Sequence, residues 1–218
     1  MTEFVIGIDV QAARGCPYAV MDGASKIINS GWIATDSLAN SVQKLSASYK
    51  GAVFAIDAPR MALPGKRNWY WGGGVWRPRA ASEKGYGRHC EVVVKAHDLA
   101  NPQWTPLAVD AQPWMKHGFD IFDALRGKAV CLEVFPTASY KMLNEVLDVR
   151  VDMSLSKFMP GPKDMLDAVV AALTGHEYLA GRGQEVGDGD GLGTIVLPRP
   201  IAQPIMEVMN WPGRFRRH

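Results

Sequence analysis

Three apolar segments of the chain each end in an acidic residue. They are Val5-Ile6-Gly7-Ile8-Asp9, Ala52-Val53-Phe54-Ala55-Ile56-Asp57 and Ala129-Val130-Cys131-Leu132-Glu133. Continuous apolar runs of this length are typical of buried strands. A carboxylate at the end of such a strand costs several kcal/mol unless it is solvated, paired or bound to a metal. Each acid therefore either caps a turn where its strand leaves the core or belongs to a site that the strands build together.

The apolar and polar positions around these segments predict an α/β fold with a mixed sheet. We expect strands at residues 4–10, 17–21, 26–34, 52–57, 128–135 and 194–197. We expect helices between Ser37 and Gly51 and at residues 80–99, 107–125, 137–147 and 163–179. Residues 59–78 predict a long loop rich in glycine, proline and tryptophan, and residues 187–191 a flexible turn or a hairpin. The 218 residues fit a single domain with an insertion at about 60–126 and a mobile tail at about 200–218.

The helix expected at residues 163–179 carries two acids near its start. One side of this helix is an apolar stripe made of Leu166, Val169, Val170 and Leu173. The other side carries Asp164 followed by the small residues Ala168, Ala171 and Gly175. A small-residue stripe lets a helix lie close to a sheet, which would hold Asp164 and Asp167 against it. Asp164 also suits the positive end of the helix macrodipole, an explanation that fits Asp167 less well.

Five acids thus come from three strand ends and one helix start: Asp9, Asp57, Glu133, Asp164 and Asp167. Ligand sites in open α/β sheets gather at the carboxyl ends of strands. Carboxylates brought together there repel one another and favour divalent cations, and an all-oxygen ligand set suits Mg²⁺ or Mn²⁺. Two such ions can stabilise both the attacking and the leaving oxygen of a phosphodiester.

Composition, net charge and cysteine content indicate the class of protein and its cellular compartment. The chain is 47% hydrophobic and 21% charged, which excludes an intrinsically disordered protein, and its net charge is only +2. Cys16, Cys90 and Cys131 are odd in number and lack metal-ligand spacing, which favours a reduced, cytoplasmic setting. We expect no signal peptide and no membrane-spanning segment.

Basic and aromatic residues alternate in the segment after the second acidic strand end. Candidate phosphate contacts in this segment are Lys66, Arg67, Arg77, Arg79, Lys84 and Arg88, and candidate stacking residues are Trp69, Trp71 and Trp76. His89 is a candidate proton shuttle or phosphate ligand, although a single histidine is more often structural. The alternative is a loop that packs its tryptophans on the sheet edge and leaves its charges in solvent.

The sequence also resembles a known family in four motifs. These are Gly7-Ile8-Asp9, Ala55-Ile56-Asp57-Ala58-Pro59, Glu133-Val134-Phe135-Pro136 and Asp164-Met165-Leu166-Asp167-Ala168. Their order and spacing resemble the domain-of-unknown-function family numbered 429, a predicted nuclease family of the ribonuclease H-like superfamily. The resemblance implies a five-stranded sheet in the order 3-2-1-4-5, with flanking helices and a helical or loop insertion after strand four.

By the same resemblance, Asp9, Asp57, Asp164 and Asp167 look like the metal ligands of related Holliday-junction resolvases, while Glu133 looks like part of this family's own Glu-Val-x-Pro signature. The turn that begins at Gln11 departs from the pattern, a difference that bears on the choice of substrate more than on metal binding.

The sequence therefore predicts a nuclease that uses two divalent cations on nucleic acid or a nucleotide. Asp9 would bridge the two ions, Asp57 with Asp164 or Asp167 would complete their ligands, and Glu133 would be an outer ligand or a base that orients water. One alternative is a non-catalytic nucleic-acid-binding module. A less favoured one is an actin-like phosphotransferase, which needs a second copy of the fold that the chain lacks.

Overall fold

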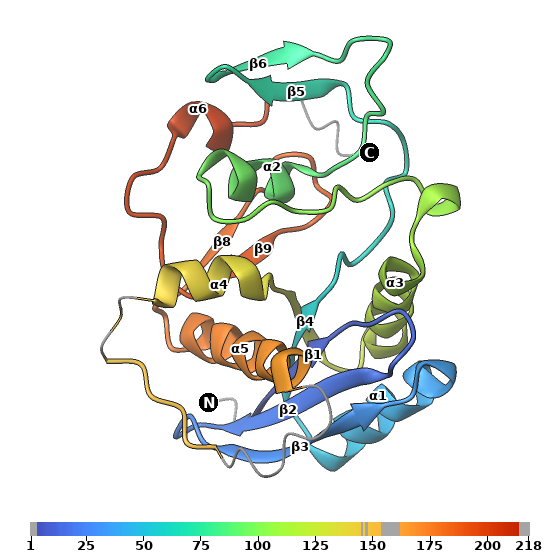
Figure 1. Ribbon diagram of the computed structural model, residues 1–218, viewed down its shortest axis with the longest axis vertical. Coiled ribbons are helices and arrows are strands. Elements are labelled where there is room, and N and C mark those ends of the chain that lie inside the picture. Colours follow the sequence, from blue (N-terminus) through green and yellow to red (C-terminus); the bar gives the residue numbers. More distant parts are fainter. Residues whose placement is uncertain (1–3, 145, 147, 154–161, 214–218) are drawn as a thin grey trace.

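A five-stranded mixed sheet forms the centre of the molecule (Figure 1). The computed structural model describes residues 4–144, 146, 148–153 and 162–213. The strands of this sheet are β1 (Phe4–Asp9), β2 (Cys16–Asp22), β3 (Ile27–Ile33), β4 (Val53–Asp57) and β7 (Val130–Glu133). Their order is β3-β2-β1-β4-β7; β1, β4 and β7 run parallel, and β2 is antiparallel to both neighbours. The predicted order of the five strands is confirmed.

Helices cover both faces of this sheet. The helices are α1 (Leu38–Ser48), α3 (Pro113–Leu125), α4 (Pro136–Leu143) and α5 (Pro162–Leu179). Helices α1 and α3 pack on one face, against Ile6, Ile8, Phe54 and Ile56. Helix α5 packs on the other face, with α4 beside it (Figure 1). No helix within the described ranges is long and apolar enough to cross a bilayer.

Helix α5 lies in direct backbone contact with β1 because Gly7 has no side chain. A Cβ atom on Gly7 would overlap the carbonyl oxygen of Ala168 and the backbone nitrogen of Ala172. Further along the helix, a Cβ atom on Gly175 would lie 2.9 Å from Val5 Cγ1. The predicted approach of the small-residue side of this helix to the sheet is confirmed.

The remaining elements form a second layer above the sheet, called here the upper layer (Figure 1). It contains β5 (Trp69–Gly72), β6 (Val75–Pro78), α2 (His89–Ala96), β8 (Gln184–Val186), β9 (Ile195–Leu197) and α6 (Met206–Met209). Two single turns of 3-10 helix, η1 (Thr35–Ser37) and η2 (Ala108–Asp110), complete the elements. Strands β8 and β9 pair as an antiparallel hairpin, one of the two conformations expected around residues 187–191.

Two predictions for residues 59–99 were wrong, and glycines explain both. Residues 69–78 form the β5–β6 hairpin instead of an irregular loop, because Gly73 and Gly74 have φ values of 61° and 79°, as its tight turn requires. The helix expected at 80–99 is limited to residues 89–96, because Gly85 and Gly87 have φ values of 76° and 96°.

Two other expected helices start or end elsewhere. The one expected at 107–125 starts at Pro113, whose fixed φ suits a first helical turn. Helix α4 ends at Leu143, and the remaining part of the helix expected at 137–147 includes residues 145 and 147, outside the described ranges.

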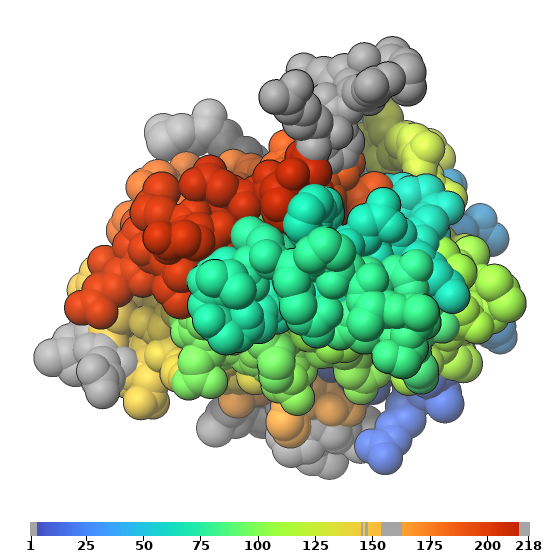
Figure 2. All heavy atoms as spheres, turned by 90° about the horizontal axis from the view of Figure 1, so that it is seen from above, coloured from blue at the N-terminus to red at the C-terminus, as the bar shows by residue number. Residues whose placement is uncertain are grey.

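The C-terminal segment that was expected to be a mobile tail has defined structure at residues 200–213. This segment contains α6, whose Val208 is 0% exposed, and Trp76 Nε1 donates a hydrogen bond to the Glu207 carbonyl (2.9 Å). Figure 2 shows the hairpin and this C-terminal segment side by side on one face. Residues 214–218 lie outside the described ranges.

Candidate active site

Asp9 and Asp57 are direct neighbours at the carboxyl ends of two parallel strands. The register of β1 and β4 pairs Asp9 with Asp57. Side chains alternate between the two faces of a strand, and Val5 and Ala55 pack on the α5 side. Asp9 and Asp57 therefore point to the α5 side, where the first turns of that helix begin.

Asp164 and Asp167 come from those first turns and are both partly buried. The Tyr140 hydroxyl donates to Asp167 Oδ1 (2.8 Å), and Lys163 Nζ donates to Oδ2 of the same carboxylate (2.7 Å). Asp167 is thus held by one donor from α4 and by one from its own helix. The spacing of Lys163 and Asp167, four residues apart on a helix, is visible in the sequence, whereas Tyr140 has no local signal.

Burial and mutual repulsion act on these carboxylates together. Burial, opposed by a hydrogen bond from Gln11, raises the pKa of Asp9 from 3.8 to about 7, and the charges of Asp167 and Asp164 add to the rise. The pKa of Asp57 is raised well above its ordinary value, first by burial and then by Asp9 and Asp167. Lys163 lowers both pKa values. The site therefore holds more negative charge than its own cation compensates.

The turn after Asp9 is fixed from two directions. Gln11 Nε2 donates to Asp9 Oδ2 (2.6 Å), so this side chain orients the carboxylate. His117 Nδ1 on α3 donates to the Gln11 carbonyl (2.8 Å). The Gln11 backbone nitrogen also contacts the Cys16 sulfur (3.4 Å). Sequence reasoning singled out the Gln11 turn only as a departure from the family, and missed the role of His117.

The structure does not bring Glu133 into this group of carboxylates. The register pairs Glu133 with Ile56, so it faces the opposite side of the sheet from Asp57. Glu133 is 3% exposed and accepts hydrogen bonds from the Arg88 guanidinium through both carboxylate oxygens. The Arg60 backbone nitrogen donates to Glu133 Oε2 (3.0 Å).

Arg88 and His89, expected to contact substrate, are both buried. Arg88 is 1% exposed and bridges Glu133 to Glu91. His89 Nδ1 accepts a hydrogen bond from the Gly189 nitrogen (2.9 Å), so its Nε2 carries the proton that is donated to the Val208 carbonyl (2.8 Å). Burial lowers the pKa of His89, which favours this neutral form. Both ring nitrogens are therefore used within the fold.

The other expected substrate contacts lie in the upper layer and divide into two groups. Lys66, Arg67 and Trp69 line an open pocket there. Trp71, Trp76, Arg77 and Arg79 belong to the β5–β6 hairpin and the residue after it, and Lys84 lies over the ring of Tyr86 (5.8 Å), outside the pocket. Within this second group, Arg77 pairs with Glu83 and Trp71 packs edge-on against Trp76.

A small cleft of about 50 Å³ connects Asp57 with the buried ionic network. Asp57, Arg88, Glu91 and Glu133 contribute to its lining, together with apolar atoms of Trp114 and Phe135. The electrostatic influence of Glu133 reaches Asp57 across this region and contributes to its raised pKa.

The donor set of the site consists of carboxylates, which suits Mg²⁺ or Mn²⁺. As the described side chains stand, no three His, Cys, Asp or Glu groups enclose a metal-sized position; Asp9 is bonded to Gln11, and Asp167 to Tyr140 and Lys163. Comparisons of the chain with protein-family models, curated proteins and solved structures found no match. The function of the protein is therefore inferred from the geometry and charge of the site.

Proposed function

We propose that this protein hydrolyses phosphodiester bonds with two divalent cations held by Asp9, Asp57, Asp164 and Asp167. The observation that carries the proposal is the in-register pair Asp9 and Asp57, at the ends of adjacent parallel strands and facing the start of α5. The sheet order β3-β2-β1-β4-β7 supports a ribonuclease H-like fold, as the resemblance implies.

The charge of the site supports cation binding. Asp9 and Asp57 have raised pKa values because they are buried beside other carboxylates, and a divalent cation would favour the ionised form of both. Bound Mg²⁺ or Mn²⁺ would supply Lewis acidity for the attack of water on a phosphodiester. Lys163 acts as a partial counter-charge on the outer side of the site, since its side chain is 82% exposed and bonded to Asp167.

Several other residues hold these carboxylates in position. Gln11 fixes the rotamer of Asp9, and Tyr140 fixes that of Asp167. The contact of Gly7 with Ala168 sets the distance between the helix and the strand that carry the acids. In this proposal Glu133 is a positioning residue, because its ion pair with Arg88 joins the upper layer to β7 beside Asp57.

The first test is a thermal melt in chelator and in Mn²⁺. We expect Mn²⁺ to raise the melting temperature of the wild-type protein by mass action and to have little effect on Asp9→Asn. Asp36→Asn is the matched control, because Asp36 is an exposed acid of η1 and is not one of the four proposed ligands, so it should leave the response to Mn²⁺ unchanged.

The second test is cleavage of DNA, RNA and hybrid substrates in Mn²⁺. We expect cleavage by the wild-type protein and by Asp36→Asn, and loss of at least about a hundredfold in Asp9→Asn and Asp57→Asn, since each removes a charged ligand oxygen. Absence of cleavage, together with a melting temperature that does not change when Mn²⁺ is added, would falsify the proposal. Strand binding that persists in chelator without cleavage would instead support the non-catalytic alternative.

A further inference from the structure

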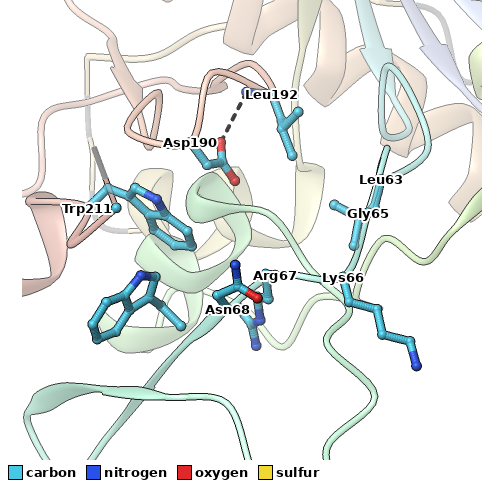
Figure 3. Close-up of a pocket in the computed structure, with 10 residues that line it drawn as sticks. Leu63, Gly65, Lys66, Arg67, Asn68, Asp190, Leu192 and Trp211 are labelled. Atoms are coloured by element: carbon cyan, nitrogen blue, oxygen red, sulfur yellow. Dashed lines mark hydrogen bonds between the residues drawn. The ribbon is translucent and has the colours of Figure 1, made fainter. Parts of the chain in front are cut away.

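The upper layer contains a pocket of about 330 Å³ that the carboxylate site does not use (Figure 3). Three segments far apart in the sequence build it: residues 63–69, residues 190–192 and residues 211–213. Its volume lies at the lower end of the range for small-molecule sites, about 300–1,000 Å³. The lining has a basic side, an acidic side and two indole rings.

Lys66 and Arg67 line the basic side of the pocket. Arg67 stacks on the rings of Tyr70 (4.2 Å) and Trp104 (4.9 Å), and its Nε and Nη1 atoms are buried without hydrogen-bond partners. Within the described residues, no acid forms an ion pair with Arg67 or with the exposed Lys66 beside it. Tyr70 and Trp104 line a neighbouring pocket, so the guanidinium of Arg67 is held there, and the exposed ammonium of Lys66 is the cation on this side that an anionic ligand can reach.

The acidic side is the carboxylate of Asp190, which lies opposite Lys66 in Figure 3. Asp190 Oδ2 accepts a hydrogen bond from the His89 backbone nitrogen (2.6 Å), and Oδ1 accepts one from the Leu192 nitrogen (3.1 Å). These two bonds fix the carboxylate, and each oxygen keeps a further lone pair for a donor. A ligand that fits both sides therefore has an anionic group at one end and an N–H donor at the other.

Trp69 and Trp211 provide an apolar surface in another part of the pocket. Trp211 is fixed by ring contacts with Trp76 (5.0 Å) and His89 (5.2 Å). Gly189 allows this packing, because a Cβ atom there would overlap Trp211. Trp69 lines the same pocket from the start of β5. Rigid indoles suit a planar aromatic ligand, since little conformational freedom is lost on stacking.

We propose that this pocket binds a nucleotide unit. Its base packs on Trp69 and Trp211, an amino group of the base donates to Asp190, and its phosphate contacts Lys66. A free mononucleotide and an unpaired nucleotide within a strand share this chemistry. The proposal goes beyond the hydrolytic site, because it requires neither metal nor turnover.

The test is isothermal titration of the Asp9→Asn protein in chelator, conditions that exclude metal-dependent hydrolysis. Cytidine monophosphate, uridine monophosphate and inorganic phosphate are the three probes. We expect saturable binding of cytidine monophosphate and about tenfold weaker binding of uridine monophosphate, which presents a carbonyl instead of an amino group to Asp190. Inorganic phosphate should bind most weakly, because it lacks the base.

Variants separate the contributions of the three sides. Trp69→Leu should weaken cytidine monophosphate at least about tenfold and leave inorganic phosphate unchanged, whereas Lys66→Ala should weaken both. Asp190→Asn should reduce the preference for cytidine over uridine. The matched controls are Trp32→Leu in β3 and Lys44→Ala in α1, neither of which lines the pocket, and both should bind like the parent protein.

A short single-stranded oligocytidylate distinguishes the two sources of the ligand. Tighter binding of the oligonucleotide than of the monophosphate would assign the pocket to a strand, and equal binding would assign it to a free nucleotide; both support the proposal. The proposal is overturned if no nucleotide saturates the protein, or if Trp69→Leu and Lys66→Ala bind like their controls. Negative results in these binding experiments would not change the results expected for the Mn²⁺ melts and the cleavage assay, so the two proposals can fail independently.

Discussion

Asp9 connects stability to pH through its raised pKa. Below about pH 4 it is protonated in both the folded and the unfolded chain. Between its ordinary pKa of 3.8 and the folded value of about 7, only the unfolded chain releases the proton, so the free energy of unfolding falls as pH rises. Over this interval the loss amounts to roughly 4 kcal/mol at about 1.36 kcal/mol per pH unit.

We predict that Asp9→Asn removes this dependence in the absence of metal. Relative to the wild type, the variant should gain about 2–3 kcal/mol of unfolding free energy between pH 5 and pH 8. Urea unfolding in chelator at the two pH values measures the difference, with Asp36→Asn as the control. A constant difference between wild type and Asp9→Asn across this range would show that the carboxylate is solvated in the folded protein.

Arg88 shows how a residue predicted at the surface can belong to the core. Its guanidinium binds Glu91 and Glu133, and Thr105 also donates to Glu91, so the acids depend on donors from separate segments. We predict that Arg88→Met lowers the unfolding free energy by about 3–5 kcal/mol, because two buried carboxylates lose their cation. Arg88→Lys should restore only part of this loss, because an ammonium group cannot bind both carboxylates in the same planar arrangement.

Chemical unfolding by urea measures these losses. Arg77→Met is the control, since the ion pair of Arg77 with Glu83 is partly exposed and its loss should have a much smaller effect. Equal stability of Arg88→Met and Arg77→Met would show that Glu91 and Glu133 become neutral or hydrated at little cost when Arg88 is removed.

The contact between β1 and α5 depends on one glycine. We predict that Gly7→Ala destabilises the protein by about 3 kcal/mol or more, because the added methyl group meets the backbone of α5 instead of a flexible side chain. Any folded fraction should also respond less to Mn²⁺, since Asp164 and Asp167 move with the helix. Gly23→Ala is the matched control: a Cβ atom at Gly23 meets nothing within 4 Å, and both its stability and its response to Mn²⁺ should be unchanged.

The elements of the central sheet were predictable because each has a strong local signal. Asp9 and Asp57 end continuous apolar runs, and α5 begins at a proline, Pro162, and keeps its helical pattern to Leu179. The β5–β6 hairpin was missed because the turn glycines Gly73 and Gly74 were read as part of an irregular loop. Glycine is common in both irregular loops and tight hairpin turns, so composition alone did not distinguish a loop from a hairpin.

The candidate site was predictable only in part, for reasons of register and distance. The place of Glu133 on the opposite face depends on which residue of β4 it pairs with, and a strand pattern without alternation does not fix that register. The pocket in the upper layer combines Lys66 with Asp190 and Trp211, more than a hundred residues away. No periodicity in the sequence connects such positions.

Among the described residues, the β5–β6 hairpin contributes to none of the buried apolar clusters, whereas the rest of the upper layer shares its clusters with elements around the sheet. Val196 of β9 belongs to the cluster on the α5 face of the sheet, and Ala138 of α4 belongs to the cluster that contains Cys90, Val93, Val94, Val186, Ile195 and Leu197. The hairpin is held to α6 and the following residues by Trp76, which bonds the Glu207 carbonyl and packs on Trp211. Small sets of contacts of this kind define units that open locally before global unfolding.

We predict that Trp76→Ala increases amide hydrogen exchange several-fold at residues 69–78 and 205–211 and leaves exchange in β1 and β4 unchanged. The control is Val75→Ala, because the side chain of Val75 is 59% exposed and its removal should alter neither region. Exchange followed by mass spectrometry measures both regions in one experiment. Faster exchange in β1 and β4 would mean that the molecule opens as one cooperative unit. Since Trp211 lines the pocket, the same variant should weaken the binding of cytidine monophosphate, whereas the response of the carboxylate site to Mn²⁺ should persist.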